Sequence, residues 1–158
     1  MSPQSPTALD FADQLGFQFH ATGGRRLAGR VLGWLIACDP PHQSAQDMAA
    51  VLGVSRSAVS PITQNLLQMG FIEQVHVPGR REIHFRIRDD GWVRMHRATF
   101  EGLVTSRKLA ELTIAALSER SPSVNRRLRV FLDFHRFMER ELPALLDRWE
   151  AEYAGSGS

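Results

Sequence analysis

The chain has 158 residues, of which 43% are apolar and 23% charged, a composition typical of a globular protein with a hydrophobic core. It argues against a disordered chain, and because no apolar run approaches about eighteen residues, it also argues against a membrane-spanning helix. The net charge is only +2, but residues 55–97 hold seven arginines against four acidic residues, so the middle of the chain is its basic part.

The start of the chain and its single cysteine both predict a cytoplasmic protein. Residues 1–6 lack the basic-then-apolar layout of a secretory signal. Cys38 has no second cysteine with which to form a disulfide or a cysteine-based zinc site, as is typical of a reducing compartment. Because Cys38 lies on the apolar face of its helix, we expect a buried small hydrophobe rather than a redox switch.

Apolar residues at helical spacing predict two helices in the first third of the chain. The first covers residues 7–20 and the second residues 25–38, where Asp39-Pro40-Pro41 stops it. Gly29 and Gly33 lie one turn apart on the second helix. Another helix is therefore expected to approach closely at these glycines.

The next two helices are short and have the spacing of a helix-turn-helix. Ser44 and Asp47 are placed to form a capping box at the start of the first helix, which Gly53 ends. Ser55 is the expected cap of the second helix, which Gly70 closes. Two short helices joined by a tight turn that contains glycine are the signature of this motif.

Pro61 lies inside the second of these helices and leaves two interpretations open. A helix-interior proline costs about 3 kcal/mol and removes the bond to the Ser57 carbonyl, so a continuous helix should kink. Alternatively, Ser60 caps a shorter helix that begins at Pro61, a favoured position for proline. The spacing of Val59 with Ile62 favours the kinked, continuous helix.

A β-hairpin is expected after the helix-turn-helix. Its strands are residues 71–77 and 82–88, and Pro78-Gly79-Arg80-Arg81 forms the turn. Alternation predicts an inner face of Ile83, Phe85 and Ile87 and an outer face of Glu82, His84, Arg86 and Arg88. A one-sided hairpin with a basic tip at this place predicts a wing, the alternative being an ordinary solvated turn.

The chain has six histidines, which raise the alternative of a metal sensor. His76 and His84 would share the outer face of the hairpin if Val77 paired near Ile83. A closed zinc site needs about four ligands, and the sequence offers no obvious third one. We therefore expect neither a metal nor a cofactor.

Two long helices are predicted to complete the chain, over residues 90–118 and 124–153, with a break at Ser121-Pro122. Apolar residues occupy much of their circumference, and such helices need partners on two sides. We expect the same region of a second chain to cover them. The expected regions of one structural unit are an N-terminal dimerisation helix (1–22), a winged helix-turn-helix DNA-binding region (23–90) and a C-terminal helical dimerisation region (91–158).

Three segments resemble the GbsR-like branch of the MarR-type winged-helix regulators. They are residues 28–35 before Asp39-Pro40-Pro41, residues 54–60 and residues 77–81, within a match from about Asp10 to Trp92. The resemblance implies a mainly α fold with a small β-hairpin wing and N- and C-terminal dimerisation helices. It further implies a homodimeric repressor that binds a pseudo-palindromic operator and responds to a small molecule.

Two residues depart from the pattern of these regulators. Gly79 stands where the wider family often has an aspartate before its arginine, and Pro61 stands where a polar or basic residue is more common. The geometry of the wing tip and of the recognition helix is therefore where this chain should differ from its relatives.

The recognition helix (55–70) would lie in the major groove of double-stranded DNA, with the basic wing (77–88) on the minor groove or flanking phosphates. Gln64 suits adenine, Arg56 suits guanine or phosphate, and the ring of Pro61 could touch a thymine methyl, which predicts A·T content there. The predicted DNA-binding residues are Ser44, Ser55, Arg56, Ser57, Ser60, Pro61, Gln64, Arg80 and Arg81.

Four residues are expected to take part in binding an effector: Phe19, Arg30, Trp34 and Trp92. Aromatic residues at helical spacing are equally typical of a plain core, and Arg30 could instead pair with Asp13. No catalytic constellation stands out, so we do not expect an enzyme. The competing function is a winged helix that contacts another protein and does not bind specific DNA.

Overall fold

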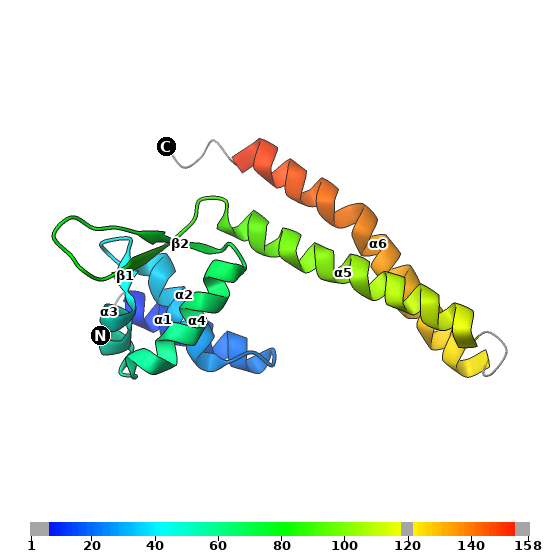
Figure 1. Ribbon diagram of the computed structural model, residues 1–158, viewed down its shortest axis with the longest axis horizontal. Coiled ribbons are helices and arrows are strands. Elements are labelled where there is room, and N and C mark those ends of the chain that lie inside the picture. The colour runs from blue at the N-terminus through cyan, green and yellow to red at the C-terminus, as the bar shows by residue number, and fades with distance from the viewer. Residues whose placement is uncertain (1–6, 118–121, 154–158) are drawn as a thin grey trace, which may run out of the picture. The chain divides into compact units, whose positions relative to one another are not determined.

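The computed structural model describes residues 7–117 and 122–153, so the predicted helix end at Ser118 and Ser121 of the predicted break lie outside the described residues. The chain forms two compact units, within residues 1–91 and 92–158, which are described separately below (Figure 1). In the described ranges, no helix combines the length and apolar character needed to cross a membrane.

Among the described residues, the first unit contains the four helices and two strands expected from the sequence and one strand that was not expected. In chain order they are α1 (Ala8–Ala21), α2 (Arg26–Ala37), β1 (Gln43–Ser44), α3 (Ala45–Leu52), α4 (Arg56–Gln68), β2 (Ile72–Val75) and β3 (His84–Ile87). The three strands form an antiparallel sheet in the order β1-β3-β2, in which His84 pairs with Ser44 on one side and Val75 on the other. Strand β1 is the addition, and it lengthens the expected hairpin into a three-stranded sheet.

Helices α1 and α2 pack closely because glycines leave room between their backbones. A Cβ atom on Gly33 would lie 2.7 Å from the Cα atom of Ala12, and one on Gly29 would lie 2.7 Å from the carbonyl oxygen of Leu15. Both distances are too short for any side chain, so the predicted close approach of another helix is confirmed. The approaching helix is α1.

The helix-turn-helix begins and ends where local chemistry predicted. Ser44 and Asp47 form the capping box of α3, and Gly53 ends that helix in the left-handed conformation at φ 67°. Ser55 caps α4 by accepting a hydrogen bond from the backbone nitrogen of Ala58 at 3.2 Å. These caps satisfy backbone donors that have no partner inside the helix.

Helix α4 is continuous through Pro61, so the shorter helix capped by Ser60 is the wrong one of the two interpretations. The reason lies in the core, because Val59, Ile62 and Leu66 are at most 9% exposed and share one face of α4. Only Val59 lies before the proline, and burying it on this face contributes about 1.5–3 kcal/mol, which offsets most of the cost of an interior proline.

Arg30 has a structural role in the first unit. The Arg30 guanidinium pairs with Asp13 of α1 and donates to the carbonyl oxygen of Leu52 at 2.8 Å, so it links three helices. Of the two roles considered for Arg30, pairing with Asp13 is therefore the one observed.

Cys38 is 7% exposed and burial raises the pKa of its thiol, which confirms a small hydrophobe rather than a reactive thiolate.

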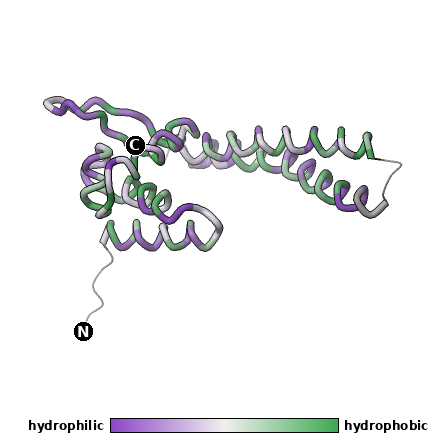
Figure 2. The backbone as a smooth tube through the Cα atoms, turned by 60° about the horizontal axis from the view of Figure 1, so that its bottom comes forward, coloured by the Kyte–Doolittle hydropathy of each residue, from purple (hydrophilic) through white to green (hydrophobic). Residues whose placement is uncertain are grey.

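The second unit is an antiparallel pair of long helices, α5 (Gly91–Leu117) and α6 (Pro122–Tyr153). Ion pairs connect them along their length: Arg97 with Asp147 and Glu150, Arg107 with Glu139, and Arg136 with Glu111. Hydrophobic and hydrophilic stretches alternate along both helices (Figure 2). Large apolar side chains remain exposed on them, namely Leu109, Leu112, Val130, Phe131, Phe134, Phe137, Leu145, Trp149 and Tyr153.

Candidate nucleic-acid interface

Helix α4 presents one polar face and one buried face. Of the side chains expected to read DNA, Arg56, Ser57, Pro61 and Gln64 are exposed and Ser60 is half-buried, and Asn65 and Gln68 of the same helix are exposed as well. The opposite face packs into the core through the apolar residues described above. The outward orientation predicted from helical spacing therefore agrees with the structure.

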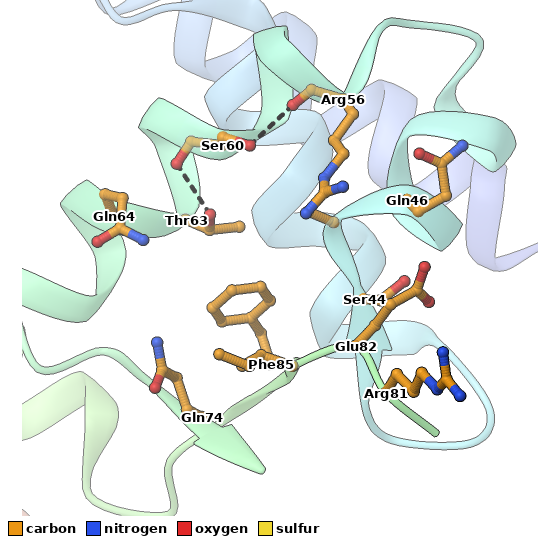
Figure 3. Close-up of a pocket in the computed structure, with 12 residues that line it drawn as sticks. Ser44, Gln46, Arg56, Ser60, Thr63, Gln64, Gln74, Arg81, Glu82 and Phe85 are labelled. Atoms are coloured by element: carbon orange, nitrogen blue, oxygen red, sulfur yellow. Dashed lines mark hydrogen bonds between the residues drawn. The ribbon is translucent and has the colours of Figure 1, made fainter. Parts of the chain in front are cut away.

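A groove of about 370 Å³ lies between α4, the start of α3 and the β2-β3 hairpin (Figure 3). The side chains that line it are Ser44, Ala45, Gln46, Arg56, Ser60, Thr63, Gln64, Gln74, Arg81, Glu82, Ile83 and Phe85. Gln46, Thr63 and Gln74 were not among the predicted residues. Gln46 follows the cap of α3 by two residues, and that position in an exposed first turn is a signal that could have identified it.

Hydroxyl groups on α4 are oriented by the helix itself. Ser60 Oγ donates to the carbonyl oxygen of Arg56 at 3.0 Å, and Thr63 Oγ1 donates to the carbonyl oxygen of Ser60 at 2.9 Å (Figure 3). Ser55 Oγ and Ser57 Oγ lie 2.9 Å apart. Because the Ser60 hydroxyl has already placed its proton, it faces the groove as an acceptor, which suits an amino group on a base edge.

The arginines of the hairpin divide into paired and unpaired groups. Arg86 pairs with Glu73 at 2.6 Å, and Arg88 pairs with Glu73 at 3.1 Å and Asp90 at 2.7 Å. By contrast, the three exposed guanidinium groups of Arg56, Arg80 and Arg81 form no ion pair or side-chain hydrogen bond within residues 7–117 and 122–153. The uncompensated positive charge of this region is therefore at the start of α4 and at the tip of the wing.

Ser44 is placed differently from the other predicted DNA-binding residues. Its side chain is 1% exposed, and its hydroxyl donates to Asp47 Oδ2 at 2.8 Å. This hydrogen bond lowers the pKa of the Asp47 carboxyl group. Ser44 thus holds the start of α3 in position, while its neighbour Gln46 supplies the exposed polar side chain.

The expected outer position of His84 is wrong. His84 is 4% exposed, because β1 pairs with β3 and the His42 ring packs edge-on against it at a centroid distance of 5.2 Å. The register places Val75 opposite His84, so His76 falls on the other face, and the pairing of Val77 near Ile83 that would have put the two histidines on one face is not formed. Among the described residues, no group of three metal-ligating side chains is arranged to hold a metal ion.

The four expected effector residues belong to different units. Phe19 and Trp34 are half-buried in the first unit, and the Trp34 indole nitrogen is buried without a hydrogen-bond partner there. Trp92 belongs to the second unit, where it lines an apolar pocket of about 450 Å³ together with Val93, His96, Leu142, Leu145, Leu146 and Trp149. Arg30 has the structural partners given above.

Comparison with known proteins places the chain among regulators of transcription. A family model described as an MmpR5-like MarR family transcriptional regulator matches residues 90–152, and a model of the IclR helix-turn-helix domain matches residues 28–76. The HTH-type transcriptional regulator MmpR5 of Mycobacterium tuberculosis (strain ATCC 25618 / H37Rv) is 35% identical over 144 residues, which are 91% of this chain and 87% of the relative. A solved structure described as a transcriptional regulator is 34% identical, with a TM-score of 0.80 over 92% of this chain and 99% of that chain.

Proposed function

Since the chain belongs to the MmpR5-like MarR family of transcriptional regulators, we propose that it acts in the cytoplasm as a homodimeric, ligand-responsive repressor of a pseudo-palindromic operator. The expected MarR-type winged helix and DNA-binding regulation are confirmed, and the relatives are regulators rather than enzymes, as expected. The narrower likeness to the GbsR-like branch stays a prediction.

The observation that carries the operator-binding proposal is the location of the unpaired guanidinium groups. Arg56 lies in the first turn of α4, where the positive end of the helix also favours phosphate, and Arg80 and Arg81 lie at the wing tip. With α4 in the major groove, Arg56 and Gln64 would contact base edges or phosphate while the wing neutralises flanking phosphates.

The exposed apolar side chains of α5 and α6 support the homodimer. Ten large apolar residues in the described parts of these helices, Trp92 included, are each more than two-fifths exposed, and monomeric proteins rarely leave apolar surface of that extent uncovered. A second copy of the same helices, related by a two-fold axis, would cover them and present two recognition helices to adjacent half-sites. We propose that α1 adds to the same interface.

The pocket at Trp92 supports an effector of apolar character. Two tryptophans and three leucines line it, with His96 as a polar group at its wall. A molecule that binds only the folded protein raises its melting temperature. Apolar compounds that do so for the wild type but not for Trp92→Ala would identify this pocket as the effector site, whereas equal shifts in both would place it elsewhere.

Binding to DNA upstream of the protein's own gene, measured by fluorescence anisotropy, tests the proposed function. We expect the logarithm of the affinity to fall linearly with the logarithm of salt from about 50 to 200 mM, and a scrambled duplex to bind more weakly. Arg56→Ala should weaken binding, while Arg129→Ala, an exposed arginine of α6, is the matched control. Absence of binding at every salt concentration would favour the competing function of protein contact.

A further inference from the structure

His84 and Asp47 connect the wing to the start of the helix-turn-helix through one charged contact. His84 is on β3, Asp47 is in the first turn of α3, and His84 Nε2 lies 3.6 Å from Asp47 Oδ2. On the other side of the ring, His84 Nδ1 lies 3.1 Å from the carbonyl oxygen of Glu82. Because a carbonyl can only accept, the Nδ1 atom carries the hydrogen in this contact.

This tautomer leaves an unfavourable contact between two hydrogen-bond acceptors when His84 is neutral. With its hydrogen on Nδ1, a neutral His84 turns the lone pair of Nε2 toward a carboxylate oxygen, so two acceptors face each other. A proton on Nε2 would turn the same contact into an ion pair. Asp47 can serve as the anion of this ion pair. The Ser44 hydroxyl and backbone nitrogen both donate to its Oδ2 atom, which holds that oxygen in place and lowers the pKa of the carboxyl group.

We propose that the protonation of His84 strengthens DNA binding by neutralising Asp47 beside the wing, so that operator affinity rises as pH falls. The proposal rests on the proposed operator-binding surface. Imidazoles change charge between about pH 5 and 8, whereas the carboxylate stays ionised in that range. In the neutral state the negative charge of Asp47 repels phosphate and attracts Arg80, which lies close enough to lower the pKa of Asp47. A positive His84 cancels both effects.

The other groups around His84 leave Asp47 as its anionic partner. From the segment before β1, His42 packs edge-on against the ring, and its buried Nδ1 has no hydrogen-bond partner in the described ranges. The strand neighbours Ser44 and Val75 are uncharged.

The charged side chains on the other elements near His84 are either engaged with other partners or positively charged. Helix α2 also packs against β3, and its two arginines are held elsewhere, Arg26 over the Phe17 ring and Arg30 by Asp13. From the wing turn, the backbone carbonyl of Glu82 contacts His84 Nδ1, and the positive charge of Arg80 acts on Asp47, whose pKa it helps to lower. The positive charge of Arg80 opposes a proton on His84, whereas Asp47, 3.6 Å from His84 Nε2, favours it.

The test is the pH dependence of DNA affinity in variants of the full-length protein. For the wild type we expect affinity to rise roughly three- to tenfold from about pH 8 to about pH 6 at fixed salt, and the salt slope to steepen by about 0.9, as for one additional phosphate contact. In His84→Gln, which keeps a donor for the Glu82 carbonyl, both changes should disappear. The matched control His76→Gln removes an exposed wing histidine and should keep them.

Asp47→Asn provides the second variant, because the side-chain oxygen of asparagine can still accept the hydrogen bond from the Ser44 backbone nitrogen but the side chain carries no charge. It should bind DNA more tightly than the wild type at about pH 8 and show no further gain at lower pH. If His84→Gln does not fold, as judged by thermal unfolding, Asp47→Asn decides the matter alone. A pH dependence that survives in Asp47→Asn, or that is lost only in His76→Gln, overturns the proposal. Salt-insensitive absence of binding at every pH would instead refute the operator-binding function itself.

Discussion

Replacing both wing arginines, Arg80→Ala together with Arg81→Ala, should weaken binding to every DNA sequence by about the same factor. Both guanidinium groups are exposed and lack ion-pair partners in the described ranges, so each is free to neutralise one phosphate. Each such phosphate contributes about 0.9 to the slope of log affinity against log salt, so the slope should fall by about 1.8. At a salt concentration of about 0.1 M, this corresponds to a loss of roughly 60-fold in affinity.

The matched control is Arg86→Ala, on the same hairpin. Arg86 is already paired with Glu73 at 2.6 Å, and Glu73 keeps Arg88 as a partner when Arg86 is removed. Its replacement should therefore change the salt slope by less than about half of one phosphate contact. Anisotropy titrations of specific and scrambled duplexes over a salt series measure both variants. An unchanged slope in the double variant, or an equal loss in Arg86→Ala, would refute the assignment of the wing contacts.

Three further predictions concern packing, assembly and the recognition helix. Gly33→Val should lower stability by about 1–3 kcal/mol, because its Cβ would lie 2.7 Å from the Ala12 backbone, whereas Gly102→Ala in open space on α5 should raise it by about 0.5–1 kcal/mol; urea unfolding measures both. Phe134→Asp, at a position 57% exposed, should shift the protein toward monomer in sedimentation experiments while its helical circular dichroism is retained, and an unchanged mass would contradict the proposed interface. Pro61→Ala should stabilise the protein by up to about 3 kcal/mol by restoring a helix hydrogen bond, and a lower melting temperature would show that the proline is not a cost.

The elements of the helix-turn-helix could be predicted because their signals are local. Ser44 and Asp47 cap a helix across three residues, Gly53 ends it through its own backbone conformation, and Ser55 caps the next helix in the same way. Interactions of this range are present in the sequence before the chain folds. The alternatives at Pro61 required one tertiary fact, the burial of Val59, and its spacing already favoured the continuous helix, while the expected kink stays a prediction.

The function class followed from the sequence for a related reason. A basic hairpin directly after a helix-turn-helix is a combination of adjacent segments, and its resemblance to MarR-type regulators agrees with the family to which the chain belongs. Which arginines are available for DNA could not be predicted in the same way. Arg86 and Arg88 are neutralised by Glu73, which lies 13 and 15 residues earlier in the chain.

The sequence by itself therefore determined the helices, the caps of α3 and α4, the close approach at Gly29 and Gly33, and the class of protein. Only the tertiary structure decided the burial of His84, since strand alternation does not reveal that Ser44, forty residues away, pairs with it from β1. The same holds for its contact with Asp47. Caps and turns depend on neighbours in sequence, whereas the free or occupied state of a charged side chain depends on which distant groups folding brings beside it.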